Sequence, residues 1–254
     1  VSTKNALGQV QRFEYDEQGR VSAVTDALSQ TTRTEYNDAG LPVKVTSPTG
    51  DVSTTDYDAL GRPVAVTDAA GRTTQYSWNA RGRLISLTDP KGGARQFDYD
   101  NGGRLMRATD CSGNATLYSY DERGFLSRVT DAEGNETVYR RDARGQIQRI
   151  TRADGTEEKF TWDGNGNLLT YRDGAGTETL YGYGQLNELH SRRTIVVPGT
   201  LGQWIGYRYD KQGRLASLRN ENNESTTFRY DALGQLIEQT GFDGRSISYE
   251  WDDA

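Results

Sequence analysis

The sequence contains very little of the chemistry on which most enzymes depend. Among 254 residues there are one cysteine, one histidine, one methionine and five prolines. The single cysteine, Cys111, excludes an internal disulfide and lies in a stretch with the composition of an exposed turn. The single histidine, His190, is the one candidate base for a Ser-His-Asp or Cys-His arrangement, and no nucleophile is positioned for it. We therefore predict that the chain is not an enzyme and has no catalytic residue.

Charge and hydropathy exclude further classes. The formal net charge is −6 and no Lys/Arg-rich run occurs, which argues against a nucleic-acid partner. No apolar run is long enough to span a bilayer, and no signal-peptide pattern is visible. The mean hydropathy of −0.82 leans towards disorder. However, 15 Tyr and 4 Trp recur at a fixed phase, which favours a folded chain with polar faces and no thick core.

A period of 21 residues dominates the chain. Glycines fall on it without a slip at Gly19, Gly40, Gly61, Gly82, Gly103, Gly124, Gly145 and Gly166. Asn187 takes the next glycine position, five extra residues follow, and the frame resumes at Gly213 and Gly234. We predict that these ten glycines are structural turn residues. A fixed period of this length indicates a repeat architecture, so residues 1–254 are predicted to form a single continuous array with an irregular insertion around 190–205.

Aromatic residues precede the glycine positions by four. They are Tyr15, Tyr36, Tyr57, Trp78, Tyr99, Tyr120, Trp162, Tyr183, Tyr209, Tyr230 and Trp251. In the residues just before each of these aromatic positions, threonine and further aromatic residues alternate with other, mostly polar residues. A period of two places the threonine and aromatic residues together on one face of a strand. We therefore predict a structural aromatic ladder across a sheet. Arg141 is the exception, and it could border a gap, meet an acidic group, or reflect simple sequence drift, which we favour.

Two turn signals alternate within each repeat. Segments such as Asp16 to Gly19 follow the aromatic residue, whereas segments such as Asp68 to Gly71 follow a Val-Thr pair. Aspartate at the first position and glycine at the fourth are typical of a type I turn with a glycine bulge. Turns spaced alternately by 10 and 11 residues leave strands of about six residues. Pro42 and Pro63 stand near the start of two such strands, where we expect local irregularity.

The predicted number of strands decides the fold class. Two strands per repeat over about twelve copies give a sheet on the order of 115 Å wide at about 4.8 Å per strand. Open twisted sheets rarely exceed about ten strands without curling or splitting. The prediction is an all-β fold: an antiparallel meander that curls into a spiral, hollow β-shell or an arc of one. Cut edges of such a sheet would allow oligomers.

No metal or cofactor site is predicted. Asp163 to Asn167 superficially resembles a loop of oxygen ligands for calcium, but it lacks the downstream bidentate glutamate. The insertion contains an apolar run from Thr194 to Gly199, which could project into a cavity or plug an end. It could equally form a longer strand pair that packs on its neighbours, and we favour this interpretation.

The segments Tyr57 to Arg62 and Tyr209 to Leu215 carry the pattern YDxxGR(L). This pattern resembles the YD repeat of rearrangement-hotspot (Rhs) proteins, toxin-complex C components, wall-associated toxins and teneurins. The resemblance implies a structural shell segment that encapsulates a C-terminal toxin domain in bacterial competition. It also implies secretion, or delivery by a bacterial secretion system. The implied partners are the rest of the shell, the toxin polypeptide and secretion-apparatus proteins.

The resemblance leaves one alternative open, a cell-surface adhesion or carbohydrate-binding module. It also raises the question of self-cleavage, which many members perform at an Asp-Pro-x-Gly-Leu element. Asp89-Pro90-Lys91-Gly92 matches that element in part, but Gly93 follows instead of leucine. We therefore interpret this segment as an ordinary second turn of the repeat.

Overall fold

The structure is a computed structural model that describes residues 1–4, 8–195 and 202–251. Among these residues there is no helix, and so none that could span a membrane. The strands are β1 (Ser2–Lys4), β2 (Val10–Tyr15), β3 (Val21–Thr25), β4 (Thr31–Tyr36), β5 (Pro42–Thr46), β6 (Val52–Tyr57), β7 (Pro63–Thr67), β8 (Thr73–Trp78), β9 (Leu84–Thr88), β10 (Ala94–Tyr99), β11 (Leu105–Thr109), β12 (Ala115–Tyr120), β13 (Leu126–Thr130), β14 (Glu136–Arg141), β15 (Ile147–Thr151), β16 (Glu157–Trp162), β17 (Leu168–Arg172), β18 (Glu178–Tyr183), β19 (Leu189–Ile195), β20 (Trp204–Tyr209), β21 (Leu215–Asn220), β22 (Ser225–Tyr230), β23 (Leu236–Thr240) and β24 (Ser246–Ser248).

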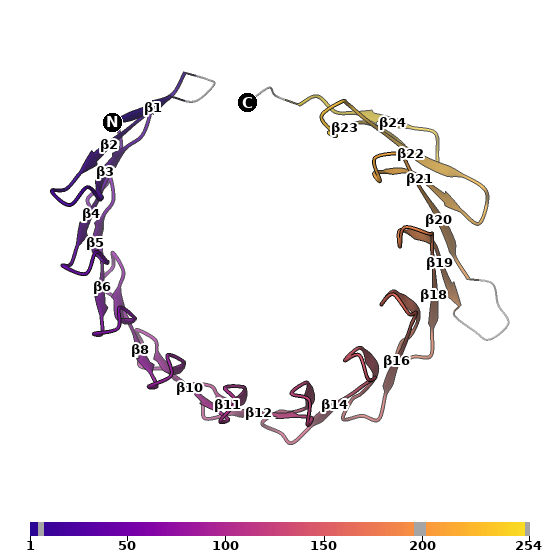
Figure 1. Ribbon diagram of the computed structural model, residues 1–254, viewed down its shortest axis with the longest axis horizontal. Helices are drawn as coiled ribbons and strands as arrows, with labels where there is room; N and C mark the ends of the chain where they lie inside the picture. Colours follow the sequence, from indigo (N-terminus) through magenta and orange to yellow (C-terminus); the bar gives the residue numbers. More distant parts are fainter. Residues whose placement is uncertain (5–7, 196–201, 252–254) are drawn as a thin grey trace. The chain divides into compact units, whose positions relative to one another are not determined.

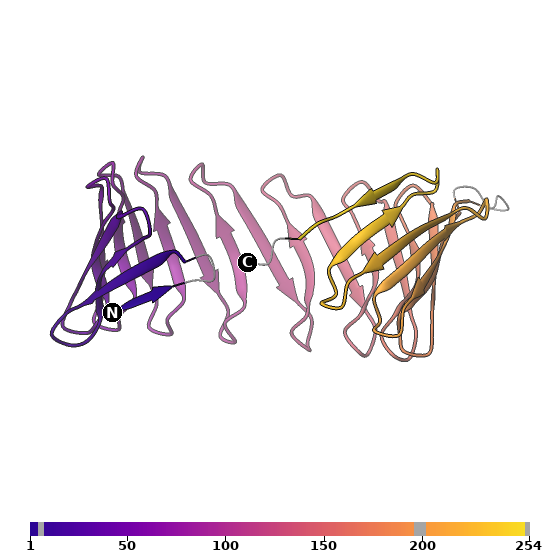
Figure 2. The same ribbon diagram turned by 90° about the horizontal axis from the view of Figure 1, so that it is seen from above.

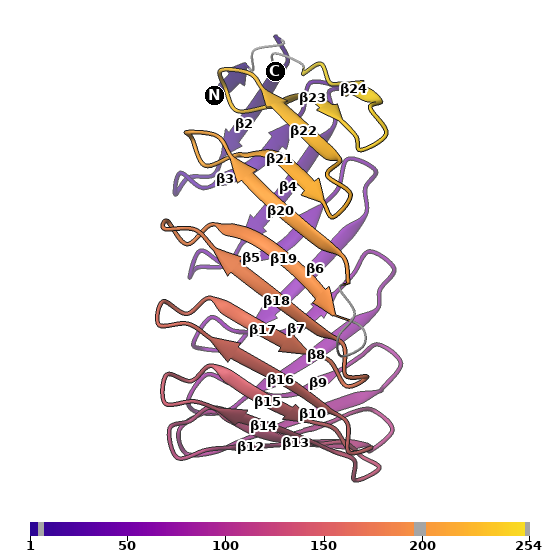
Figure 3. The ribbon, with the colours of Figure 1, turned by 90° about the vertical axis from the view of Figure 1, so that its right-hand side faces the viewer.

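The chain divides into two units, residues 1–117 and 118–253, and the boundary falls within β12. Each unit by itself is a bent sheet one layer thick (Figure 1). Strands run slantwise between two rows of turns in each unit (Figure 2), and in the second unit β14 to β20 lie side by side (Figure 3). Contacts between described strands join consecutive ones only, and all pairs are antiparallel. The predicted all-β antiparallel meander is confirmed.

The turns have the geometry that their sequences predict. In the turn from Asp16 to Gly19, the amide of Gly19 donates to the carbonyl of Asp16 at 3.0 Å, and the Asp16 amide donates to the Arg20 carbonyl at 2.9 Å. The Asp16 carboxylate accepts the amides of Gln18 and Arg20 at 3.0 and 2.8 Å. This pattern is a type I turn closed by a bulge, and the same backbone pair recurs at Asp89, so the Asp89-Pro90-Lys91-Gly92 segment is an ordinary second turn.

Left-handed backbone at the fourth turn position explains why glycine is so regular there. All ten predicted turn glycines have φ between +76° and +93°. Ser29, Asn187 and Asn223 occupy the equivalent position with φ of 64°, 60° and 73°. Asparagine tolerates this region better than most residues because its short polar side chain can hydrogen-bond locally.

The expected irregularity at Pro42 and Pro63 is present, but other copies without proline share it. Pro42 lies opposite Tyr36 and Pro63 opposite Tyr57, with a register shift at each pair. The same shift occurs where Val21 lies opposite Tyr15. The hairpins from β2–β3 to β10–β11 and from β14–β15 to β22–β23 all have a bulge at this point. Proline is accepted because the ladder is already interrupted there.

The sheet has almost no core. Among the described residues, Ala23 is the one buried hydrophobic residue, at 1% exposure, and Thr226 is the one buried polar residue, at 5%. No large side chain in this part of the chain is fully buried. Burial alternates along strands such as β4 and β8, where the face that carries the aromatic residue is half-buried and the other face is exposed. This alternation agrees with the predicted common face. Cys111 is exposed, as expected for a turn residue.

The insertion lengthens one pair of strands. β19 has 7 residues and pairs with β18 from Ile195 to Leu189, and with β20 through Ser191, Arg192 and Arg193. Thr194 and Ile195, the first residues of the apolar run, belong to β19. This part agrees with the predicted longer strand pair, while residues 196–201 lie outside the described residues.

Alanine substitution at two turn glycines tests the role of the positive φ. Gly82 has φ +79° and open space where a Cβ would lie, whereas a Cβ on Gly145 would lie 2.5 Å from the Phe125 ring. Gly82→Ala should lower the free energy of unfolding by about 1–2 kcal/mol, the cost of left-handed backbone. Gly145→Ala should cost more, because Phe125 must also move. Urea unfolding of both variants measures the difference, and equal losses would contradict the packing argument.

Candidate functional site

Adjacent hairpins separate at the edge of the sheet that carries the first turns. The hairpin β2–β3 is paired up to Tyr15 and Val21, beside the turn. The next ladder, β3–β4, is paired only from Thr25 to Ala23, at the far end of the strands. The same short ladder joins β5 to β6 and β7 to β8. Side chains must therefore link the hairpins at the first-turn edge.

The predicted aromatic ladder fills these gaps. Tyr36 Oη donates a hydrogen bond to the carbonyl oxygen of Val21, fifteen residues earlier, at 2.8 Å. The same bond, at 2.7–3.0 Å, joins Tyr57 to Pro42, Trp78 to Pro63, Tyr99 to Leu84, Trp162 to Ile147, Tyr230 to Leu215 and Trp251 to Leu236. Tyrosine and tryptophan suit this position because each combines an apolar ring with one polar donor.

The remaining members of the ladder differ in detail. Tyr209 bonds the carbonyl of Leu189 at 3.1 Å, twenty residues earlier, because the insertion lies between them. Burial raises the pKa of Tyr183 and of Tyr209, with smaller contributions first from a neighbouring tyrosine and then from a carboxylate. Tyr120 holds the same place in β12, and Tyr15, at 47% exposure, is the most open tyrosine of the ladder.

Where arginine follows the turn glycine, as at Arg20, Arg62 and Arg214, it adds a second contact to the link. Arg20 Nε donates to Asp16 Oδ2 at 2.6 Å within its own turn. Its Nη1 donates to the carbonyl of Asn37 in the next repeat at 3.0 Å, and its Cζ lies 4.7 Å from the centre of the Tyr36 ring. We call this set of turn aspartate, arginine and next aromatic residue the inter-hairpin clamp. Arg62 with Trp78, and Arg214 with Tyr230, form it in the same way.

One clamp has its two partners exchanged. Phe125 stands after Gly124 in the arginine position, and Arg141 stands in the aromatic position of the next repeat. Arg141 Cζ lies 5.6 Å from the centre of the Phe125 ring, and its Nη1 donates to the carbonyl of Gly145 at 3.0 Å. The sequence interpretation of Arg141 as simple drift is therefore wrong, because the cation–π contact is preserved with the roles reversed.

The turn carboxylates are held in their charged form. Hydrogen bonds from the side chain and backbone of Arg62 lower the pKa of Asp58 below its ordinary value of 3.8. A side-chain bond from Asn167 does the same for the pKa of Asp163, which also accepts the amides of Asn165 and Asn167. The Asp163 carboxylate is thus engaged by its own turn, and no cluster of three or more metal-ligating side chains occurs in the described ranges.

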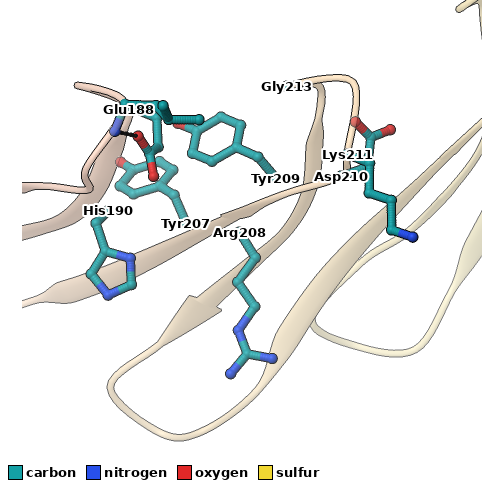
Figure 4. A pocket seen from close by; sticks show the side chains of 9 residues that line it. Glu188, His190, Tyr207, Arg208, Tyr209, Asp210, Lys211 and Gly213 are labelled. Carbon is teal, nitrogen blue, oxygen red and sulfur yellow. Dashed lines mark hydrogen bonds between the residues drawn. The ribbon is translucent and has the colours of Figure 1, made fainter.

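The interrupted repeat contains a hollow of about 640 Å³. Its lining includes His190, Tyr207 and Tyr209. Glu188 takes the arginine position and turns back to accept the amide of Leu186 at 2.9 Å. Figure 4 shows both tyrosines on the same side as Glu188, whereas Arg208 points away. No cysteine, serine or threonine is among the residues that line this hollow.

Comparison with protein families decides the relationship. A model described as Teneurin YD-shell matches residues 52–225. The chain belongs to the YD-shell family. A second model, RHS Repeat, matches residues 1–29, 15–52 and 209–246 of this YD-shell chain. No curated protein matches the sequence significantly.

Solved structures share the YD-shell fold. The crystal structure of TcdB2-TccC3 aligns with a TM-score of 0.58 at 20% identity, and that of TcdB2-TccC3-TEV with 0.56 at 21%. The Photorhabdus luminescens Tc holotoxin pore aligns with 0.55 at 21%. Each alignment covers 94% of this chain and 16% of the other. The chain therefore spans about a sixth of the length of these structures.

Reasoning from the sequence located the aromatic residues and the glycines, but it did not find the contacts that join one repeat to the next. The contact between repeats joins residues 16 apart, such as Arg20 and Tyr36. That spacing is present in the sequence, and the reversed order at Phe125 and Arg141 is the signal that could have revealed it.

Restoring the usual order of the exchanged clamp tests its role. Phe125→Arg alone places two guanidinium groups together and should lower the free energy of unfolding, whereas Phe125→Arg combined with Arg141→Tyr should recover part of the loss. We expect a favourable coupling of about 0.5–1 kcal/mol, the usual size of a cation–π contact at an exposed site. Urea unfolding of the wild type, both single variants and the double variant measures it, and additive losses would contradict the contact.

Acid should weaken the clamp at Asp58. Its pKa is lowered in the folded state, so the stabilisation is complete above the unfolded pKa of about 3.9 and is lost as the pH falls through the folded value. Asp58→Asn should therefore destabilise the protein at about pH 7 and differ little from wild type at about pH 2. Asp38→Asn, which removes an exposed carboxylate without a hydrogen bond among the described residues, is the control. Thermal melts measure the effect, and a difference in Tm between wild type and Asp58→Asn that stays constant across this pH range would exclude it.

Proposed function

We propose that this chain is a wall segment of a toxin-related shell that encloses a polypeptide. The observation that carries the proposal is the inter-hairpin clamp. It joins successive hairpins of a one-layer sheet at the edge where the backbone ladder is missing. A wall needs this kind of sideways connection because it has no second layer to hold its parts in place.

The faces of the sheet suit a wall that separates two compartments. Almost no side chain is fully buried in the described residues, so neither face depends on packing against another sheet. The exposed face of strands such as β4 carries Arg33 and Glu35, and the half-buried face carries threonine and tyrosine. Such surfaces can lie against a polypeptide without a matching hydrophobic core. In this function the chain itself performs no reaction.

The family and the solved structures support this proposal. The matched family model is named for a shell, and one structure that shares the fold is that of the Photorhabdus luminescens Tc holotoxin pore. One title describes TcdB2-TccC3 without its hypervariable C-terminal region. By analogy, we infer that the partners of this chain are the rest of its own shell, an enclosed C-terminal toxin polypeptide and secretion-apparatus proteins. The corresponding location is outside the producing cell, after secretion or delivery.

The alternative, adhesion or carbohydrate binding, has less support from the geometry. Sugar binding would use the open faces and polar atoms of the aromatic ladder. Arg20, Arg62 and Arg214 lie over the rings of the next repeats. The polar atoms of those rings already donate to backbone carbonyls. The ladder is therefore committed to holding the sheet together.

Proteolysis of the full-length protein that carries these repeats tests the proposal. Mass spectrometry should recover an enclosed segment intact from the wild type after digestion. The combined variant Arg62→Ala and Arg214→Ala opens two clamps and should speed cleavage of that segment roughly tenfold, because proteolysis follows the population of open forms.

Arg72→Ala is the matched control for this experiment. Arg72 pairs with Asp68 in its own turn, as Arg62 does with Asp58, but it has no contact with the next repeat among the described residues. Its loss should leave protection unchanged. If the protease cuts this segment as fast in the native wild type as in the denatured protein, the proposal that the shell encloses it is wrong.

A further inference from the structure

Four cations form a continuous row across the second unit. Arg140 of β14 lies opposite Arg149 of β15, Arg149 lies opposite Lys159 of β16, and Lys159 lies opposite Arg172 of β17. Directly opposed residues share one face of a sheet, about 4.8 Å from strand to strand. We call these four residues the cationic row, and Figure 3 shows the strands that carry it side by side.

Most of the row is exposed and poorly neutralised. Arg140, Lys159 and Arg172 are classed as exposed. Glu157 pairs with both Arg149 and Lys159, at 3.1 Å each. The side chains of Arg140 and Arg172 make no hydrogen bond or ion pair with any described residue. Glu178 lies opposite Arg172 in the next ladder, but no ion pair joins them. One carboxylate therefore pairs with two of the four cations, and the other two have no acidic partner among the described residues.

Folding does not account for this arrangement. Like charges directly opposite each other destabilise a sheet. The first unit follows that rule at the equivalent positions, where Glu35 lies opposite Lys44 and Asp98 opposite Arg107. The chain as a whole carries a net charge of −6, so a row of cations is not a consequence of composition.

A hollow of about 460 Å³ adjoins one end of the row. Lys159 and Arg172 line it together with the carboxylates of Asp154, Glu157 and Asp173. A ligand that occupies it must satisfy both signs of charge. A polypeptide can do so, because acidic side chains can meet the cations while backbone amides meet the carboxylates. A nucleic-acid backbone offers phosphates alone, which the three carboxylates would repel.

We propose that the cationic row of β14–β17 is a docking surface for an acidic polypeptide segment. The match is one of charge, with side-chain carboxylates of the partner placed along the row and part of its backbone beside the hollow. The surface is defined by the sheet of the second unit alone. It therefore stands whether or not the chain encloses a toxin.

Binding of a fluorescently labelled ten-residue glutamate-rich peptide tests the proposal. The wild-type chain should bind it at low salt, and affinity should fall as added salt screens exposed charges. Arg140→Gln combined with Arg172→Gln should weaken binding about tenfold, from two exposed charge contacts. Circular dichroism should show that this variant keeps the β-sheet spectrum.

A matched pair of substitutions controls for net charge. Lys91→Gln combined with Arg107→Gln removes the same charge, at a turn and at the strand position equivalent to Arg149, and should change affinity less than about twofold. The proposal is overturned if the wild type does not bind the peptide, or if both double variants lose affinity equally. It is also overturned if a single-stranded oligonucleotide of equal charge, or vesicles of anionic lipid, bind as tightly and depend on the same two arginines.

Discussion

The hydrogen bond from the aromatic residue of one hairpin to a backbone carbonyl of the hairpin before it, reinforced by arginine at several junctions, is the constraint on which the rest of the sheet depends. Backbone ladders hold each hairpin together up to its first turn, but they leave neighbouring hairpins unpaired at that edge. The clamp closes this gap with a hydrogen bond to a backbone carbonyl, an ion pair and a cation–π contact. None of these depends on a buried core, which explains how a chain with 33% hydrophobic residues can form a large ordered sheet.

The exchanged clamp indicates what the site requires. Phe125 and Arg141 keep the contact while each occupies the place of the other. The position after the glycine therefore does not require a cation, and the position before the turn does not require a ring. Either order of cation and ring keeps the contact. A Cβ on Gly145 would lie 2.5 Å from the Phe125 ring, so this ring packs directly on the turn of the next repeat. The residue after the glycine therefore has a second role, which is to cover that turn.

Much of the fold could be predicted because the sequence repeats its own rules. Aspartate and glycine at fixed spacing predicted the hairpin turns, and alternation before Tyr36 predicted its face. The errors concern relations between repeats. The bulge opposite Pro42 recurs in hairpins that have no proline, and period-based reasoning about one strand does not show it. The exchange at Arg141 was missed because each position was judged alone, whereas the contact joins residues 16 apart. The cationic row was missed for a similar reason, since its members become neighbours only through the register of four strands.

Contacts in each unit join consecutive strands only, so every hairpin is stabilised by its immediate neighbours. A gene that gains or loses one 21-residue copy would therefore leave each surviving junction chemically intact, provided that arginine and aromatic residue still meet. Such a protein can change its length by recombination between its own copies, because the new junction uses the same contacts as the others. The five extra residues between Asn187 and Gly213 show that it also accepts additions within a copy.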